Sequence, residues 1–355
     1  RDNGYSTGIF GKWHLGDEAA YRPDKRGFEE VFMHGAGGIG QSYGGTCGDA
    51  PGNKYFNPFI LHNNKFVKTE GFCTDIFFSQ AITWMEKKKE QKKPFFTYIS
   101  TNAPHGPFIS PEKYKAPFAK AGYNGRQQGF YGMIANIDER MGTLMAKLNE
   151  WDIADNTILI FFSDNGGNMY NTVDGTTPTS NAPLRGGKAS MFEGGVRVPM
   201  IVAWPGKVKP QTVNHNLVSN LDYAETFLDI AGAEIPDDMQ GKSLAGLMKA
   251  SPSSAEDLTP APQTIGFSKS LSNCTQPDFR DALYYHYYEF NGERRTAHMV
   301  RRHYGVRTDR YKLIHFYNLD EWELYDLEKD AREMRSVYDD PDYAKVIADL
   351  KTRVA

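Results

Sequence analysis

The chain has 355 residues, 40% of them hydrophobic, and a formal net charge of −3 at pH 7. That length is enough for one large domain with a buried core and a smaller second domain. The small negative charge excludes a strongly basic nucleic-acid-binding protein. The 355 residues contain no run of 18 or more apolar residues, so they predict no membrane span.

The first residues and the cysteines give no sign of a signal peptide or of a disulfide framework. Residues 1–5 lack the apolar segment of a signal peptide, so we expect any signal segment to lie outside this chain. Cys47, Cys73 and Cys274 are too few for a disulfide framework, and their spacing does not suggest a zinc site. A bridge between Cys47 and Cys73 and a free buried thiol are equally compatible with the sequence.

The first 249 residues alternate between apolar runs and helical patterns, which is typical of α/β proteins. Helices with one apolar face are expected at residues 75–89 and 130–149. Residues 33–70 are rich in glycine, asparagine and aromatic residues and are predicted to form a long loop. Strands are expected at residues 7–10, 95–100, 156–162 and 200–203.

The last third of the chain has a different character. Residues 250–263 are dense in serine, proline and alanine and are predicted to be a linker. Residues 304–308 and 311–317 alternate around a turn and predict a β-hairpin, and a helix is expected at residues 341–353. We therefore expect a large α/β domain at residues 1–249 and a small antiparallel sheet with one helix at residues 264–355.

The first motif with side chains suited to binding or catalysis is the segment Gly4–Gly16, which contains the sequence Gly-Lys-Trp-His-Leu-Gly. Residues two apart on an extended segment point the same way, so Lys12 and His14 would face one site while Trp13 enters the core. An ammonium group beside an imidazole suits an anionic substrate and proton transfer. An exposed lysine and a hydrogen-bonded histidine at a strand end would explain the pair equally well.

Two further motifs follow directly after predicted strands, where open α/β sheets bind ligands. His105 ends the sequence Asn-Ala-Pro-His, whose proline would stiffen the turn that aims the imidazole. Asp164 and Asn165 place a carboxylate beside an amide oxygen, which suits a hard cation such as calcium. Asp-Asn-Gly is also ordinary turn chemistry, so a simple turn is the alternative.

A glycine-rich stretch forms the last motif. Lys188 lies within it and could reach an anion, while Arg197 could pair with Glu193 or another carboxylate to hold the loop. The residues alone favour a structural role for Lys188 and Arg197.

In this order the motifs resemble those of the sulfatase family, the branch of the alkaline-phosphatase superfamily that includes arylsulfatases. Gly4–Gly16 resembles the family's second signature, and residues 323–330 resemble the end of its small C-terminal domain. The resemblance implies an alkaline-phosphatase-like fold, with a large mixed sheet sandwiched by helices. It also implies hydrolysis of sulfate esters of carbohydrates, as in similar bacterial N-acetylglucosamine-6-sulfatases of mucin and glycosaminoglycan pathways, by a periplasmic or secreted protein.

The resemblance implies a role for each catalytic candidate. Lys12 and Lys188 match the lysines that hold the sulfate oxygens. His14 matches the histidine that helps to release sulfate from the intermediate. His105 matches the histidine near the ester oxygen and is the candidate acid for the leaving alcohol.

The resemblance also implies a calcium ion and a nucleophile. Asp164 and Asn165 match two of the calcium ligands. The family's nucleophile is a formylglycine made from a cysteine or serine in a Cys/Ser-x-Pro/Ala-x-Arg motif, and none of the 355 residues lies in such a motif. The paired aspartates that supply the other calcium ligands are missing too. We therefore expect an N-terminally truncated chain with half a metal site that is inactive by itself.

The C-terminal region carries the candidates for substrate contact. Residues 284–289 and 298–308 are rich in aromatic, histidine and arginine side chains, which can stack on sugar rings and bind their polar groups. A packed sheet with aromatic cross-strand pairs is the alternative for most of the tyrosines. His298, Arg302 and His303 are the predicted sugar contacts.

Two other functions compete with the sulfatase interpretation. A phosphatase or phosphodiesterase of the same superfamily would typically use two zinc ions and more histidine and aspartate ligands, whereas a single Asp-Asn pair with lysines favours sulfate. A fragment that binds a sulfated glycan without cleaving it is compatible with the lysines and the missing nucleophile.

Overall fold

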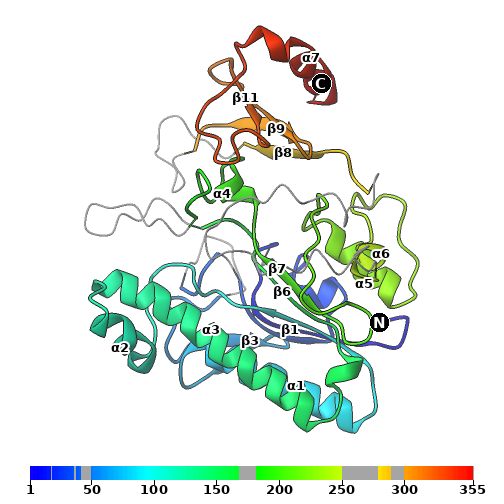
Figure 1. Cartoon of the computed structure of the whole chain (residues 1–355). Coiled ribbons are helices and arrows are strands. Elements are labelled where there is room, and N and C mark those ends of the chain that lie inside the picture. Colours follow the sequence, from blue (N-terminus) through cyan, green and yellow to red (C-terminus); the bar gives the residue numbers. More distant parts are fainter. Residues whose placement is uncertain are drawn as a thin grey trace. The chain divides into compact units, whose positions relative to one another are not determined.

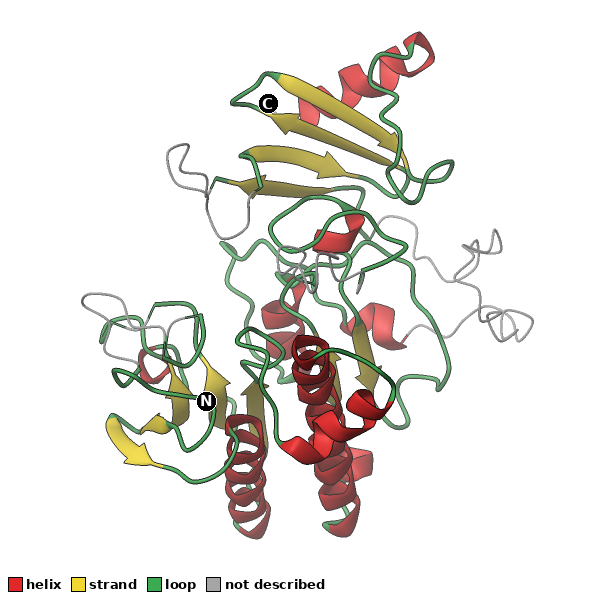
Figure 2. Ribbon diagram, turned by 90° about the vertical axis from the view of Figure 1, so that its left-hand side faces the viewer, coloured by secondary structure: helices red, strands yellow, loops and turns green. Residues whose placement is uncertain are grey.

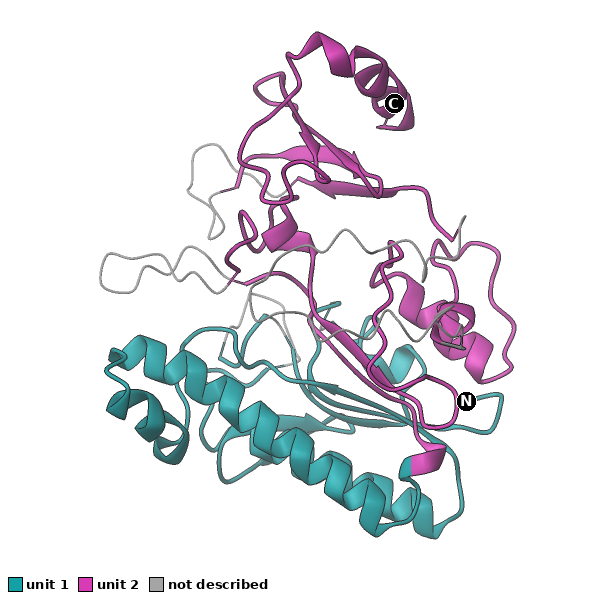
Figure 3. Ribbon diagram, viewed as in Figure 1, with its two compact units in different colours: residues 1–154 teal, residues 155–355 magenta. Residues whose placement is uncertain are grey.

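The computed structural model describes residues 1–16, 18–35, 37–40, 49–167, 181–249, 279–288 and 300–354. The chain forms two compact units, a first unit at Arg1–Ala154 and a second unit at Asp155–Ala355 (Figure 3). No helix in these described ranges is long and apolar enough to cross a membrane. The predicted linker at residues 250–263 lies outside the described residues, so the predicted domain boundary stays a prediction.

The first unit is built on a mixed five-stranded sheet with the order β4-β3-β2-β1-β5. Strand β1 pairs in parallel with both β2 and β5, while β3 is antiparallel to both β2 and β4. Strands β1 and β3 are labelled in Figure 1. The strands are β1 (Ser6–Lys12), β2 (Glu30–His34), β3 (Phe59–His62), β4 (Lys65–Lys68) and β5 (Phe95–Ser100).

Alternating side chains of β1 and β2 divide between the two faces of this sheet. One face packs an apolar cluster that includes Ile9, Val31 and, as the sequence predicts, Trp13. On the other face, Phe10 and Phe32 lie against rings of helix α1 (Cys73–Glu90). Lys12 and His34 have the same parity as these two phenylalanines and therefore lie on the α1 face, at the carboxyl ends of their strands.

Helices cover the α1 face of the sheet. The long helix α3 (Gly125–Glu150) packs beside α1, and the short α2 (Glu112–Lys120) packs on α3 (Figures 1 and 2). Asn124 begins α3 with a capping box, in which its side chain accepts from the Gln127 backbone N–H and the Gln127 side chain accepts in return. A single turn, η1 (Pro23–Lys25), connects β1 to β2.

The second unit contains a two-stranded antiparallel pair and a four-stranded antiparallel sheet with the order β11-β10-β9-β8. Helix α7 packs on one face of the four-stranded sheet, where Leu350 joins a cluster with Val306, Leu313 and Leu324. This arrangement confirms the predicted small antiparallel sheet with one helix. The elements are η2 (Ala154–Asn156), β6 (Leu159–Phe162), α4 (Glu193–Val196), β7 (Met200–Ala203), α5 (Asp222–Ile230), α6 (Ala245–Lys249), β8 (Leu283–Tyr287), β9 (His303–Arg307), β10 (Tyr311–Phe316), β11 (Glu321–Asp326), η4 (Pro341–Tyr343) and α7 (Ala344–Val354).

The prediction of one long loop at residues 33–70 is wrong. This stretch contains the end of β2 and the hairpin of β3 and β4. Asn63 and Asn64 form the hairpin turn with φ angles of 45° and 71°, a conformation that asparagine tolerates and that matches the twist of paired strands. Cys73 is a buried free thiol, while Cys47 lies outside the described residues.

Gly11 provides a test of how tightly β1 is held against β5. Its φ is 128°, and a Cβ atom there would lie 2.0 Å from the carbonyl oxygen of Ser100. Gly4 also has a positive φ, of 85°, but a Cβ atom there would meet nothing within 4 Å.

We expect Gly4→Ala to cost about 1 kcal/mol of unfolding free energy from backbone strain alone. Gly11→Ala should cost about 3 kcal/mol or more, because the clash adds to the strain. Chemical denaturation of the two variants measures the difference, and equal losses would contradict this account of β1.

Candidate active site

The catalytic candidates of the first unit lie at the carboxyl edge of its sheet. Lys12 ends β1 and is the register partner of His34 at the end of β2. The backbone N–H of Trp13 donates to the carbonyl oxygen of His34 over 3.0 Å, which extends this pairing by one residue. Strand β5 is parallel to β1 and leads into the segment that carries His105. Because parallel strands end at the same edge, the edge gathers lysine and histidine side chains.

His34 is a fourth member of this group that the sequence did not single out. Its side chain is fully buried, its ring stacks on Phe77 of α1, and its Nδ1 lies 2.9 Å from the carbonyl oxygen of Gly35. Burial, together with the positive charges of Lys12, His14 and His105, lowers the pKa of His34 from 6.5 to about 3. His34 is therefore a neutral imidazole at pH 7, with Nδ1 as the donor.

The sequence contained one signal for His34, which the loop prediction concealed. Residues 31–33 form a short apolar run that ends on His34, much as residues 6–12 end on Lys12. The Nε2 atom of His34 has no hydrogen-bond partner in the described part of the chain. A buried acceptor of this kind beside cationic groups is typical of a functional site.

His105 is held by its backbone. Its N–H donates to the carbonyl oxygen of Asn102 over 2.8 Å, and the hydroxyl of Tyr55 donates to the carbonyl oxygen of His105 over 3.1 Å. Asn102 is itself buried and accepts from the thiol of Cys73 over 3.3 Å. The Nδ1 atom of His105 lies 2.8 Å from the carbonyl oxygen of Gly106. When Nδ1 donates there, a second proton can only occupy Nε2, the atom that would protonate a leaving group.

In the second unit, hydrogen bonds join the calcium candidates to the lysine candidate. The Asp164 turn (residues 163–167) follows β6, and Lys188 lies in the glycine-rich loop (residues 181–197). The N–H of Lys188 donates to the carbonyl oxygen of Gly167, and the N–H of Gly166 donates to that of Gly195, both over 2.9 Å. The structure therefore holds Asp164, Asn165 and Lys188 on one pair of linked loops.

Close backbone contact explains the glycines in these loops. A Cβ atom at Gly166 would lie 1.9 Å from the carbonyl oxygen of Gly194, so a larger residue would force the loops apart. The side chain of Asn181 strengthens the junction, because its Nδ2 donates to the carbonyl oxygens of Gly167 and Gly186 over 3.2 and 3.0 Å.

The donor chemistry of the Asp164 turn fits calcium. Asn165 donates from Nδ2 to the carbonyl oxygen of Gly166 over 2.9 Å, which leaves its Oδ1 as the amide atom that a cation would use. Asp164 adds a carboxylate. Calcium takes about six to eight oxygen ligands, so these two residues would supply part of its coordination shell.

The sugar-contact candidates differ in how far the structure describes them. His298 lies outside the described residues. Arg302 is half-buried, and its Nε atom has no hydrogen-bond partner among the described residues. His303 is only 2% exposed, and its ring stacks on Tyr287 while its Nδ1 lies 2.7 Å from the carbonyl oxygen of Arg301. This ring is therefore part of the packed sheet, and its burial lowers the pKa of His303.

Comparison with known proteins identifies the family. The family model described as "Sulfatase" matches residues 1–233, and the model "N-sulphoglucosamine sulphohydrolase, C-terminal" matches residues 258–355. The chain belongs to the sulfatase family. Its members are sulfuric ester hydrolases, and the motifs of the first 233 residues were the correct guide to it.

Curated sulfatases resemble this chain over different lengths. The N-acetylglucosamine-6-O-sulfatase of Bacteroides thetaiotaomicron is 28% identical, over 96% of this chain and 68% of the relative. The N-acetylgalactosamine-6-sulfatase of Homo sapiens is 32% identical, over 66% of this chain and 44% of the relative. The chain thus spans about two thirds of the bacterial enzyme and less than half of the human one.

Solved structures confirm the predicted alkaline-phosphatase-like α/β fold of this sulfatase chain. The protein Ps i-CgsB, in complex with k-i-k-neocarrahexaose, superposes with a TM-score of 0.77 at 26% identity, over 99% of this chain and 71% of that chain. A structure in complex with its substrate D-glucosamine-2-N,6-O-disulfate gives a TM-score of 0.70 at 25% identity, over 99% and 79% of the two chains.

The buried His34 should make the sulfatase chain sensitive to mild acid. Its pKa in the folded state, about 3, lies below the ordinary 6.5, so the unfolded chain binds the proton more readily. Folding stability from this group is therefore present above pH 6.5 and is lost as the pH falls toward 3. Between pH 7 and pH 5 the loss should be about 2 kcal/mol.

Urea denaturation at several pH values measures this loss. His34→Gln and His34→Leu differ in polarity but share the absence of a titrating group. Both should show a pH dependence that is weaker than that of the parent chain by the same amount. A parent-like pH dependence in both variants would show that His34 is not the cause.

Proposed function

We propose that this chain contributes most of the active site of a calcium-dependent sulfatase that releases sulfate from a sulfated carbohydrate. The observation that carries the proposal is the gathering of Lys12, His14, His34 and His105 at one sheet edge, in a chain of the sulfatase family. A lysine ammonium and several imidazoles suit an anion that must be bound and then receive or lose protons.

The proposed substrate is N-acetylglucosamine-6-sulfate within mucin or glycosaminoglycan. Support comes from the names of two relatives, an N-acetylglucosamine-6-O-sulfatase and an N-acetylgalactosamine-6-sulfatase. The structural relative bound to D-glucosamine-2-N,6-O-disulfate gives further support. Such substrates lie outside cells, so we propose a periplasmic or secreted protein.

Each residue then has one task. Lys12 and Lys188 would neutralise the sulfate oxygens as negative charge shifts during cleavage. His105, with Nδ1 directed to the Gly106 carbonyl, would deliver a proton from Nε2 to the leaving alcohol. His14 would take part in the release of sulfate. Asp164 and Asn165 would hold calcium, which supplies positive charge at the sulfate group when bound.

The nucleophile must come from outside these residues. The family's Cys/Ser-x-Pro/Ala-x-Arg motif does not occur anywhere in the 355 residues. We therefore propose that the chain by itself does not hydrolyse sulfate esters, and that an active protein combines these residues with that motif. A phosphatase of the same superfamily and a non-cleaving glycan-binding protein are the alternatives.

The proposal predicts sulfate release only when the chain is joined to the nucleophile motif. That complete protein should release sulfate from an aryl sulfate and from sulfated N-acetylglucosamine, while the 355-residue chain should not. Chelation should abolish the release and calcium should restore it. Lys12→Ala and Lys188→Ala should each lower kcat/KM about 100-fold or more, as expected for a lost charge at an oxyanion. The exposed Lys207 gives a matched control, since Lys207→Ala should leave kcat/KM unchanged.

Other outcomes separate the alternatives. Faster hydrolysis of phosphate esters than of sulfate esters would favour a phosphatase or phosphodiesterase. Saturable binding of sulfated sugar without any release would favour a glycan-binding protein.

Sugar recognition predicts a difference between large and small substrates. We propose Arg302 and His298 as sugar contacts, whereas the buried ring of the third predicted contact, His303, packs in the sheet that carries Arg302. Arg302→Ala should raise KM for sulfated N-acetylglucosamine about 10-fold while leaving KM for a small aryl sulfate unchanged, because the loss of a contact to the sugar weakens the binding of the sugar substrate alone. The neighbouring exposed Arg301 serves as the control, with no change expected for Arg301→Ala. An equal rise for both substrates would argue against a sugar contact.

A further inference from the structure

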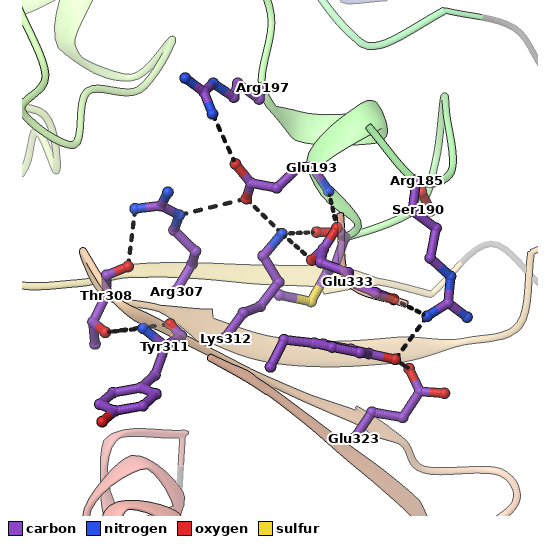
Figure 4. Close-up of polar contacts among 12 residues, drawn as sticks. Arg185, Ser190, Glu193, Arg197, Arg307, Thr308, Tyr311, Lys312, Glu323 and Glu333 are labelled. Atoms are coloured by element: carbon purple, nitrogen blue, oxygen red, sulfur yellow. Dashed lines mark hydrogen bonds and ion pairs between the residues drawn. The ribbon is translucent and has the colours of Figure 1, made fainter. Parts of the chain in front are cut away.

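A fully buried lysine of the C-terminal sheet holds the glycine-rich loop (residues 181–197). The Nζ atom of Lys312, on β10, donates to the carbonyl oxygen of Met191 over 2.7 Å. The same atom lies 2.7 Å from Oε1 of Glu193 and 2.8 Å from Oε1 of Glu333 (Figure 4). The ammonium group therefore has three oxygen neighbours, two of which belong to the loop.

The two carboxyl groups beside Lys312 have pKa values shifted in opposite directions. Burial alone would raise the pKa of Glu193, but Lys312 and Arg307 bring it below its ordinary value. Burial raises the pKa of Glu333, and the attraction of Lys312 offsets this only in part. Glu193 is thus the anionic partner of the ammonium. Glu333 accepts from the backbone N–H of Glu193 over 2.6 Å, at the first residue of α4.

Arg197 contributes less to this anchor than the sequence suggested. Its guanidinium lies 4.0 Å from the Glu193 carboxylate and is half-exposed, whereas Lys312 and Arg307 approach the same carboxylate to 2.7 and 3.5 Å. Exposed pairs at that distance stabilise little. The cation that holds Glu193 therefore comes from a position more than a hundred residues away in the sequence.

A second anchor holds the loop on the other side of Lys188. Arg185 donates from Nη1 to the hydroxyl of Tyr325 over 2.8 Å and to the carbonyl oxygen of Glu333 over 2.7 Å (Figure 4). Its guanidinium also stacks 3.9 Å above the ring centroid of Phe192. Lys188 thus lies between two points at which the loop is tied to the C-terminal sheet.

The anchored loop in turn carries the Asp164 turn. Lys188 and Gly195 each form a backbone hydrogen bond to residues 166–167, as described above. The loop is also closely packed, since a Cβ atom at Gly195 would lie 2.1 Å from the carbonyl oxygen of Ser190. A shift at Glu193 would therefore move the backbone of both Lys188 and the turn.

We propose that Lys312, assisted by Glu333, is a positioning residue for sulfate binding. It sets the place of Lys188 and of the Asp164 turn without touching the substrate itself. The inference rests on the proposed role of Lys188 in holding sulfate. Desolvation makes a buried ion pair a weak source of stability, so a role in geometry accounts better for a charged group at this position.

The test uses the complete protein that carries the nucleophile motif, with an aryl sulfate as substrate. Lys312→Met keeps the side-chain volume and removes the ammonium. We expect KM to rise 10-fold or more at a temperature at which circular dichroism shows the variant folded. In a Lys188→Ala background the same substitution should have a smaller effect, because the part that acts through Lys188 is already lost. An effect on KM of the same size in both backgrounds would overturn the proposal, as would an unchanged KM in the folded single variant.

A gentler variant and a matched control complete the test. Tyr325→Phe removes one acceptor of Arg185 and no charge, so we expect a KM rise of about two- to fivefold from a hydrogen bond of ordinary strength. Arg310 lies in the turn between β9 and β10, and its carboxylate partners, Asp326 at 3.0 and 2.8 Å and Glu328 at 3.2 Å, are not part of the loop. Arg310→Met should lower the melting temperature without changing KM.

These variants keep the proposal open to refutation in every case. If Lys312→Met does not fold, Glu333→Gln tests the same anchor, because it removes a carboxylate beside Lys312 at nearly constant shape, and an unchanged KM in that folded variant would overturn the proposal. Failure of the proposed function has a different signature, namely a parent protein that releases no sulfate at all.

Discussion

The parallel pairing of β1 with β2 and β5 decides which side chains meet in the first unit. Because the three strands run the same way, their carboxyl ends form one edge, and the residues that end them become neighbours. Alternation along β1 then sorts Trp13 into one core and Lys12 onto the face covered by α1. The positively charged edge is a consequence of strand direction, and no local motif could have produced it alone.

Burial controls the charge of that edge. Lys12, His14 and His105 all raise the positive potential around His34, and full burial adds a larger cost to protonating its ring. The neutral state of His34 lets three cationic or potentially cationic groups share the edge with an uncharged neighbour. An anion such as sulfate would lower the energy of this arrangement, which is the electrostatic reason that the site suits the chemistry of the family.

In the second unit, the candidate side chains are brought together by loops and not by paired strands. Its candidate residues lie on loops, so their places depend on glycines that allow backbone contact and on side chains that reach in from the C-terminal sheet. Lys312 and Arg185 tie the loop to that sheet on both sides of Lys188. The small antiparallel sheet, supported by α7 on its other face, thus serves as a fixed base for the glycine-rich loop.

The sequence by itself determined the kinds of elements and the family, because hydrophobic period, turn chemistry and short motifs are local properties. It located Lys12, His14, His105, Asp164, Asn165 and Lys188 in their motifs and predicted the hairpin of β9 and β10. Only the tertiary structure decided which distant residues meet. His34 joins Lys12 through strand pairing, and Lys312 meets Met191 across 121 positions of the chain. Contacts of this kind depend on how segments pack, and no window of sequence records them.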